Sequence, residues 1–314
     1  MDFSLSEEQE AFVATAAEFA AERMAPFAAD WDRDDTFPVD VLRDAAALGF
    51  AAMVVSPERG GSGLTRLDAA LVFEALAAAC PSTAAYLSIH NMVATMIDRF
   101  GADTQKDADL PSLAAMERLA SYCLTEPSSG SDAASLRTRA VREGNDYVLT
   151  GEKAFISGGG RADLYLVMAR SGGEGAAGIS AFMVENGSPG LSFGAQEEKL
   201  GWHSQPTAAV VLDDCRVPAA RRLGAEGEGF RIAMSGLDGG RLNIAACSLG
   251  AATAALQQAV RYTKERTQFG RPIASFQASE FKLADMATAL EASRLMLHRA
   301  AAALDAGEPD ASQR

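Results

Sequence analysis

Apolar residues in the first part of the chain recur at helical spacing. Phe12, Ala16 and Phe19 lie three or four positions apart, after Ser6 and a run of acidic residues. Such spacing puts the apolar side chains on one side of a helix, and a serine before acidic residues is typical of a helix start. The pattern continues in two later stripes and predicts an N-terminal α-helical domain over residues 1–119.

Residues 120–226 change to short runs of β-forming residues, most of them separated by Gly, Asn and Asp. The runs do not alternate with helical stretches, which disfavours a parallel Rossmann sheet. Their spacing is typical of a small antiparallel structure, so we expect a middle antiparallel β-barrel or β-sheet domain. The runs lie at 147–150, 154–157, 164–167, 179–183 and 208–212.

Helical periodicity returns over residues 227–314, with leucines every seven residues at Leu283, Leu290, Leu297 and Leu304. The repeat fits a coiled-coil interface or, as we favour, the core of an ordinary helical bundle. Only two long helices are apparent where a four-helix bundle needs about twice as many. We therefore expect an incomplete C-terminal helical bundle with exposed apolar surface, within an α+β multidomain protein.

Composition narrows the classes of function. The 314 residues include 28 Lys and Arg against 42 Asp and Glu, for a net charge of -14. This balance disfavours a broad nucleic-acid surface or a polybasic membrane contact. No apolar run reaches the ~18 residues of a membrane span, and the acidic N-terminus does not resemble a leader. We expect a cytoplasmic protein if the source is bacterial, or a mature mitochondrial-matrix form if it is eukaryotic.

The cysteines offer neither a disulfide framework nor a metal site. They are widely separated, with no Cys-x-x-Cys pair and no histidine at ligand spacing. We expect free, buried thiols and no metal at Cys80, Cys123, Cys215 and Cys247.

The densest cluster of small polar residues is the segment 122–132, Tyr-Cys-Leu-Thr-Glu-Pro-Ser-Ser-Gly-Ser-Asp. A strand-like start runs into a turn in which Gly130 allows close backbone approach. Ser128, Ser129 and Ser131 add small donors beside exposed N–H groups, an arrangement suited to an anion such as pyrophosphate. A simple connecting loop explains the segment equally well when it is taken alone.

Two further segments carry aromatic residues next to polar ones. In 151–160 the side chains of Phe155 and Ser157 share one face of a strand, where they could support a planar heterocycle. Phe155 could equally belong to the sheet core. The segment 264–273 is basic, carries an aromatic residue and lies between two long helices. Taken alone, it fits an αα-hairpin connection with solvated charges.

The three segments, taken in this order, resemble the acyl-CoA dehydrogenase family. The resemblance covers nearly the whole chain. The stretch Cys123–Asp132 matches the first sequence signature of that family at each restricted position. The resemblance implies an oxidoreductase that uses FAD and an acyl-CoA. Four shorter stretches are most similar to the branch that acts on isobutyryl-CoA: 88–92, 154–158, 204–207 and 237–243.

The resemblance assigns FAD contacts to the segment that begins at Tyr122. Leu124 and Thr125 would lie at the isoalloxazine, with Thr125 donating a hydrogen bond to the polar edge of the ring. Gly130 and Ser131 would cradle the pyrophosphate, and Ser131 would also touch the CoA of the substrate.

The resemblance also places Phe155, Ile156 and Ser157 on a strand beside the flavin. Many members have Trp where this chain has Phe155, a change that keeps an apolar wall and gives up an indole N–H donor. On the helix that follows the sheet, Asp238 and Arg241 would line the acyl-CoA site, with Arg241 as a counter-charge for its phosphates.

Residues of the third segment would reach the FAD of a neighbouring subunit. A site shared in this way implies a homo-oligomer, at least a dimer and usually a dimer of dimers. The residues are Arg266, Phe269, Phe276 and Gln277.

The implied reaction is the α,β-dehydrogenation of a short branched acyl-CoA in branched-chain amino-acid or fatty-acid catabolism. A carboxylate removes the α-proton while the β-hydride passes to the flavin, and an electron-transferring flavoprotein is the expected reoxidant. Hydrogen bonds to the thioester carbonyl stabilise the developing enolate, and burial raises the pKa of the base. The alternatives are a non-catalytic fragment that binds FAD or acyl-CoA, and a flavin oxidase or monooxygenase on the same fold.

No residue of the chain is nominated as the catalytic base. In most of the family it is a Glu in a later segment, which we expect beyond Arg314, so that the 314-residue chain would be a shortened form with impaired activity. A smaller group places it at the position of Gly240, which has no side chain. Structural roles are expected for Glu126, His90 and His203, and a binding role for Asp238. Glu280 and Asp285 are expected to face solvent or a partner on the bundle helix.

Overall fold

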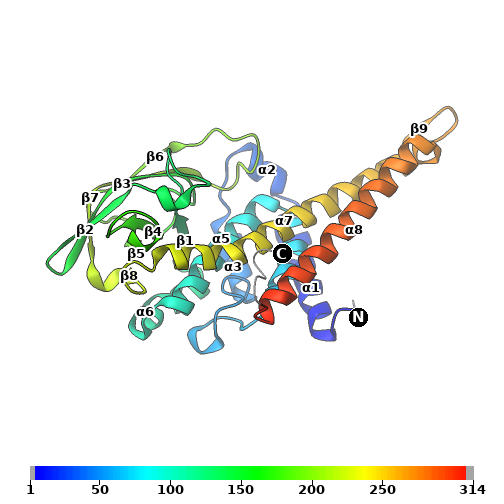
Figure 1. Ribbon diagram of the computed structural model, residues 1–314. Coiled ribbons are helices and arrows are strands. Elements are labelled where there is room, and N and C mark those ends of the chain that lie inside the picture. Colours follow the sequence, from blue (N-terminus) through cyan, green and yellow to red (C-terminus); the bar gives the residue numbers. More distant parts are fainter. Residues whose placement is uncertain (1–3, 309–314) are drawn as a thin grey trace. The chain divides into compact units, whose positions relative to one another are not determined.

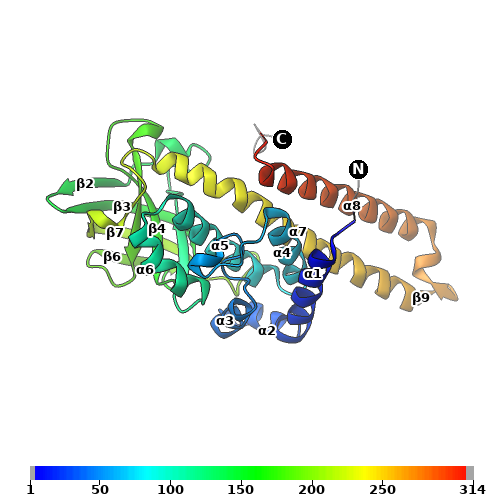
Figure 2. The same cartoon turned by 90° about the horizontal axis from the view of Figure 1, so that it is seen from below.

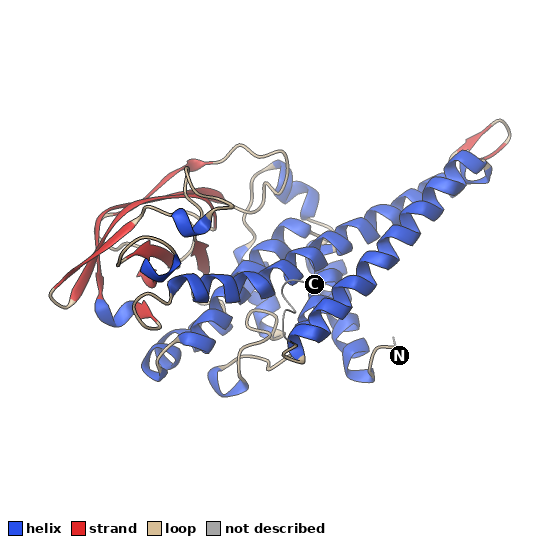
Figure 3. Cartoon of the chain, in the orientation of Figure 1, coloured by secondary structure: helices blue, strands red, loops and turns tan. Residues whose placement is uncertain are grey.

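The computed structural model describes residues 4–308 and shows helices in the first and last parts of the chain with strands between them (Figure 1, Figure 3). The expected α+β fold is confirmed. No helix in this range is both long and apolar enough to cross a membrane. The α-helices are α1 (Glu7–Phe19), α2 (Ala28–Arg33), α3 (Val39–Ala47), α4 (Arg66–Ala77), α5 (Pro81–Phe100), α6 (Asp103–Ala114), α7 (Gly229–Glu265) and α8 (Gln277–Asp305).

Side-chain caps explain where helices α1 and α4 begin. The Ser6 hydroxyl accepts a hydrogen bond from the Gln9 N–H at 3.2 Å, and the Gln9 side chain accepts one from the Ser6 N–H at 3.1 Å. Thr65 and Asp68 form the same reciprocal arrangement at the start of α4. Each cap satisfies N–H groups that the first turn of a helix leaves unpaired, and the helix start expected at Ser6 is confirmed.

The strands between the helices form one mixed sheet in the order β6–β7–β3–β2–β4–β5–β8, with β1 paired to β4. Most neighbours are antiparallel, but β4 pairs in parallel with both β1 and β2. The purely antiparallel sheet that we expected is therefore corrected, because the long excursion between β1 and β4 lets β4 return in the direction of β1. The strands are β1 (Ala120–Cys123), β2 (Arg139–Glu143), β3 (Asp146–Ser157), β4 (Leu164–Arg170), β5 (Ile179–Glu185), β6 (Leu191–Gln196), β7 (Thr207–Pro218) and β8 (Arg222–Leu223).

Strand β3 joins two runs that the sequence pattern indicated as separate. It continues through Gly151 and pairs along most of its length with β7. A Cβ atom at Gly151 would lie 2.5 Å from the Thr138 hydroxyl, so the close approach of that residue requires glycine here. The register of β3 against β7 shifts between Lys153 and Ile156, which creates a β-bulge near the end of β3.

Contacts divide the chain into two compact units. The helical unit comprises Met1–Ala29, Thr65–Ala85 and Arg241–Arg314, and the sheet unit comprises Asp30–Leu64 and Tyr86–Gly240. Helices α5 and α7 each contribute residues to both units. This grouping differs from the expected division into 1–119, 120–226 and 227–314, which stays a prediction.

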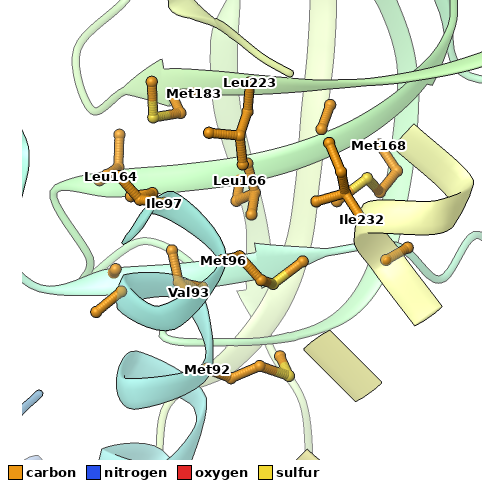
Figure 4. Close-up of a cluster of buried hydrophobic side chains, with 14 of the residues drawn as sticks. Met92, Val93, Met96, Ile97, Leu164, Leu166, Met168, Met183, Leu223 and Ile232 are labelled. Carbon is orange, nitrogen blue, oxygen red and sulfur yellow. The ribbon is translucent and has the colours of Figure 1, made fainter. Parts of the chain in front are cut away.

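The sheet unit has a continuous apolar core. Figure 4 shows Met96 and Ile97 of α5 close to Leu164 and Leu166 of β4, together with Ile232 of α7. Each of these side chains is at most 1% exposed. Burying a side chain of this size contributes about 1.5–3 kcal/mol. The core therefore fixes α5 and the start of α7 against the sheet.

In the helical unit, α4 packs against α1 and α8. Arg294 of α8 donates hydrogen bonds to Glu74 of α4 at 2.9 Å and to Thr253 of α7 at 3.0 Å. Helix α8 runs back along the later part of α7 (Figure 1, Figure 2). Side chains of the two helices line an apolar groove of about 880 Å³. Leu297 of the heptad stripe is buried, but Met286 is 45% exposed. The apolar surface expected on these helices is present.

We expect Leu166→Ala to lower the free energy of unfolding by about 2–5 kcal/mol, because the fully buried side chain leaves a cavity. Leu200→Ala is the matched control: Leu200 is fully exposed, so its truncation should change stability by no more than about 0.5 kcal/mol. Urea denaturation followed by circular dichroism measures both. Equal losses in the two variants would contradict the placement of this core.

Candidate functional site

A compact turn, which we call the Ser-Gly turn (124–132), follows β1. The Glu126 N–H donates to the Ser129 carbonyl at 3.0 Å, and the Ser129 N–H donates to the Glu126 carbonyl at 3.1 Å. The Ser129 hydroxyl adds a bond to the carbonyl three residues ahead. These bonds close the turn on itself and leave Gly130 and Ser131 exposed.

Gly130 and Ser131 present free hydrogen-bond donors. Within residues 4–308, neither backbone N–H donates to a protein oxygen. A Cβ atom at Gly130 would meet nothing within 4 Å. Successive N–H groups that face open space form a concave site for an anion. The turn thus has the donors and the space that pyrophosphate needs, while its role stays a prediction.

A buried ion pair joins the Ser-Gly turn to β3. Lys153 is fully buried, Glu126 is 5% exposed, and the Lys153 Nζ donates to Glu126 Oε1 at 2.7 Å and to the Leu124 carbonyl at 3.1 Å. The Glu126 carboxylate also accepts from the N–H groups of Arg137 at 2.6 Å and Thr138 at 2.9 Å. Burial favours a raised pKa for Glu126, but the charge of Lys153 and these hydrogen bonds hold the pKa below its usual range.

The β-bulge of β3 points an aromatic ring outward. Phe155 has a φ of 57° and is 66% exposed, while its neighbours Ala154 and Ile156 are buried. Positive φ is strained for a bulky residue, and such strain collects at functional sites. The alternative that Phe155 belongs to the sheet core is wrong. The Ala154 N–H donates to the Thr125 carbonyl at 2.9 Å, which links the bulge to the Ser-Gly turn.

Ser157, the last residue of β3, follows the bulge and is half-buried, so the shared face with Phe155 stays a prediction. Its hydroxyl accepts from the Gln205 side chain at 2.5 Å, and its carbonyl accepts from the Ser121 hydroxyl at 2.6 Å. Gln205 lies between β6 and β7, and its carbonyl accepts from Lys199 Nζ. The β6–β7 connection is thus fixed against the end of β3.

Tyr122, just before the Ser-Gly turn, and Leu124, its first residue, are packed inside the sheet unit. Leu124 belongs to the apolar core, and Tyr122 packs against that core. Among the described residues, the buried Tyr122 hydroxyl has no hydrogen-bond partner, and the half-buried Thr125 hydroxyl makes no hydrogen bond. Buried polar groups normally find a partner. Both hydroxyls therefore retain unused hydrogen-bonding capacity.

Helix α7 carries the two residues expected to line an acyl-CoA. Asp238 lies in the sheet unit and Arg241 begins the next segment of the helical unit, and both interact within the protein. Their binding roles stay predictions. A Cβ atom at the intervening Gly240 would lie 2.8 Å from the Met92 sulfur, so a side chain at this position would require Met92 to shift.

The third predicted group lies where α7 meets α8, in a β-hairpin formed by β9 (Thr267–Gln268) and β10 (Arg271–Pro272) (Figure 1). Phe269, at the tip, has a φ of 51° and is 94% exposed, and its ring lies edge-on to Phe276 at a centroid distance of 6.1 Å. The β-hairpin replaces the plain αα connection considered above. The structure brings four predicted residues into this segment: Arg266, Phe269, Phe276 and Gln277.

The cysteines of the chain are buried thiols. Burial raises the pKa of Cys123 to about 12 and that of Cys215 to about 11. The expectation of free, buried cysteines is confirmed for Cys80, Cys123, Cys215 and Cys247. Over residues 4–308 the structure contains no group of three or more His, Cys, Asp or Glu side chains that could hold a metal ion.

Three family models match successive parts of the chain. The acyl-CoA dehydrogenase N-terminal domain matches residues 6–117, the middle domain residues 121–215 and the C-terminal domain residues 227–314. The chain belongs to the acyl-CoA dehydrogenase family. The resemblance in the sequence is thereby confirmed.

Two similar relatives are the mitochondrial isobutyryl-CoA dehydrogenases of Bos taurus and Dictyostelium discoideum. They are 58% and 56% identical, and each alignment covers 98% of this chain and 74% of the relative. The butyryl-CoA dehydrogenase structure from Megasphaera elsdenii aligns with a TM-score of 0.95 at 38% identity, covering 99% of this chain and 83% of that one. A structure of PigA in complex with FAD gives a TM-score of 0.95 at 32% identity, with 98% and 82% covered.

Two histidines of this family member were considered as bases, and both are held by backbone groups. His90 is fully buried; its Nδ1 accepts from the Ala120 N–H at 3.0 Å, and its Nε2 donates to the Leu113 carbonyl at 2.9 Å. His203 donates from Nε2 to the Lys199 carbonyl at 2.6 Å. These bonds give both side chains the structural role that we expected.

Lys153 and Gln205 were not singled out from the sequence as site residues. For Lys153 a signal was available, because it falls on the same side of β3 as the buried residues Tyr147 and Leu149. A lysine at a buried position of a strand indicates a buried partner. Gln205 lies in a connection whose path the sequence does not reveal.

We expect His90 to lower the free energy of unfolding as the pH falls from about 6.5 to about 4. Burial lowers its pKa from 6.5 to about 4, so in this window the unfolded chain binds a proton that the folded chain does not. His90→Gln should remove this part of the pH dependence. Urea denaturation at several pH values measures it, with His203→Gln as control, because the Lys199 hydrogen bond raises the pKa of His203. An unchanged slope in His90→Gln would contradict the assignment.

Proposed function

We propose that this acyl-CoA dehydrogenase-family chain binds FAD at the Ser-Gly turn and the bulge of β3. The strongest support is the combination of free N–H groups at Gly130 and Ser131 with the exposed, strained ring of Phe155. The N–H groups would hold the pyrophosphate, and Phe155 would form an apolar wall for the isoalloxazine. Thr125 and Ser157 would supply hydroxyls to its polar edge. The residues present therefore fit FAD.

Bound FAD supplies the acceptor for the two electrons removed from an acyl chain. Of the chain's own residues, Asp238 and Arg241 would line the acyl-CoA, with Arg241 opposite its phosphates, and Ser131 would also contact the CoA. We assign no general base among the described residues. Glu126 is unsuited to this role, because its carboxylate is ionised and engaged by Lys153 and two backbone N–H groups.

The substrate class that we propose is a short branched acyl-CoA, with isobutyryl-CoA as the first compound to test. Identities of 58% and 56% to isobutyryl-CoA dehydrogenases over almost the whole chain support this choice. The reaction would be α,β-dehydrogenation, as in branched-chain amino-acid catabolism. An oxidase is the second candidate, because a prolyl acyl carrier protein oxidase shares the fold with a TM-score of 0.92 at 28% identity.

We further propose an electron-transferring flavoprotein as reoxidant and a dimer of dimers as the assembly. A structure described as an electron transferring flavoprotein of Acidaminococcus fermentans aligns with a TM-score of 0.96 at 42% identity. The exposed hairpin with Arg266, Phe269, Phe276 and Gln277 would reach the FAD of a neighbouring copy. The compartment would be the mitochondrial matrix in a eukaryote or the cytoplasm in a bacterium, and the two relatives named above are mitochondrial.

The decisive experiment adds isobutyryl-CoA anaerobically to the FAD-loaded protein. We expect the absorbance of the oxidised flavin to fall, and electron-transferring flavoprotein to restore it. If the protein binds FAD but isobutyryl-CoA does not bleach the flavin absorbance, the chain has a binding function and no dehydrogenase activity on this substrate. Bleaching followed by steady peroxide production in air, with no need for the flavoprotein, would favour the oxidase.

We expect Gly130→Ala to weaken FAD binding while leaving the fold intact. The added methyl group meets no protein atom within 4 Å, but it stands beside the N–H groups that a phosphate must approach. A rise in Kd on the order of tenfold corresponds to about 1.4 kcal/mol. Titration followed by flavin fluorescence measures the Kd. Gly173→Ala is the matched control, because its Cβ atom also meets nothing within 4 Å. Equal FAD affinity in both variants would exclude the Ser-Gly turn from the site.

A further inference from the structure

Lys153 is a charged residue on the side of β3 that otherwise carries buried apolar side chains. Its side chain is fully buried and shares one side of β3 with Tyr147 and Leu149. Burial disfavours its charged form and lowers its pKa, an effect that Glu126 opposes. A buried charge is retained only where other groups compensate it.

The ion pair attaches both ends of one segment to the sheet. At the start of the segment, Lys153 Nζ binds the Leu124 carbonyl, and at its end the Glu126 carboxylate binds the N–H groups of Arg137 and Thr138. Between these bonds the segment has a further anchor, because Leu136 is buried and Arg170 donates to the Leu136 and Ala134 carbonyls. The ion pair itself fixes the chain at Leu124 and Glu126, where the Ser-Gly turn begins, and at Arg137 and Thr138.

The groups expected to touch the flavin have no such anchors. The N–H groups of Gly130 and Ser131 donate to no oxygen of the described residues, and the hydroxyl of Thr125 is also unbonded there. Their directions depend on the backbone that carries them. The same is true of Phe155, which follows Lys153 by two residues and sits in a bulge bonded to the Thr125 carbonyl through Ala154.

We propose that Lys153 and Glu126 are positioning residues for the flavin site, and that their pair orients the Gly130 and Ser131 N–H groups and the Phe155 ring toward one ligand. This inference rests on the proposed FAD binding. Neither side chain touches the ligand. The pair acts by fixing the Ser-Gly turn to the bulge of β3 before FAD arrives, so that binding needs little rearrangement.

If the ion pair were merely structural, FAD affinity would change only as far as the stability of the sheet unit changes. Two variants distinguish this structural role from the positioning role. Lys153→Met leaves the Glu126 carboxylate buried without its cation, so it should lower both stability and FAD affinity. Adding Glu126→Gln removes the orphaned charge. Replacing both charges by neutral groups often restores stability, but methionine still cannot hold the Leu124 carbonyl.

The experiment measures three quantities for the full chain at a temperature at which each variant is folded. They are the urea midpoint, the Kd for FAD, and the hydrogen exchange of amides 124–132 in the FAD-free protein. In Lys153→Met we expect the Kd for FAD to rise about 10- to 100-fold, the range known for metal sites that lose a residue orienting a ligand. We expect the amides of the turn to exchange at least about tenfold faster. In the double variant the urea midpoint should recover, while the Kd and the exchange should not.

Glu143→Gln is the control, because it breaks the exposed ion pair with Arg216 at 2.8 Å on the same sheet. It should change none of the three quantities. An FAD affinity that follows the urea midpoint through the series, or turn amides that exchange as in the unaltered chain, would overturn the positioning role. If Lys153→Met does not fold, the double variant provides the comparison, because its urea midpoint should match that of the unaltered chain while its Kd for FAD stays raised. An unaltered chain that takes up no FAD would instead refute the proposed function, and with it the flavin part of this inference.

Discussion

The pairing of Lys153 with Glu126 is the constraint on which the candidate flavin site depends. An ammonium group in the interior of a sheet must be compensated, and breaking such a pair costs about 3–5 kcal/mol. Here the compensating carboxylate also binds two backbone N–H groups and belongs to the Ser-Gly turn. One buried contact therefore satisfies the lysine and fixes the turn, while the outward N–H groups of Gly130 and Ser131 remain free for an anion.

The strained bulge of β3 complements this turn. A residue such as Phe155 at positive φ costs about 1–3 kcal/mol and persists only where the surrounding structure determines it. The flanking residues supply that determination: β3 pairs with β7 on both sides of the bulge, and the Ala154 N–H binds the Thr125 carbonyl. The same bonds leave the aromatic ring exposed beside the Ser-Gly turn rather than in the core.

Much of the fold could be predicted from periodicity, because helices and strands bury one side at a regular interval. The helix start at Ser6 was visible from its capping residues, and the segment Cys123–Asp132 was visible from its resemblance to a family signature. The parallel pairing of β4 was not, because periodicity does not name a strand's neighbours. Nor was the partner of Lys153, which lies 27 residues earlier in a turn. Phe155 stayed ambiguous because its direction depends on a bulge that only the register against β7 reveals.

We propose that the Ser-Gly turn and the bulge of β3 together form the FAD site. A crystal structure of the protein loaded with FAD would show this. We expect pyrophosphate oxygens within hydrogen-bonding distance of the Gly130 and Ser131 N–H groups, and the isoalloxazine in contact with Phe155. FAD bound elsewhere on the chain, with those N–H groups bonded to protein oxygens and Phe155 away from the ring, would contradict it.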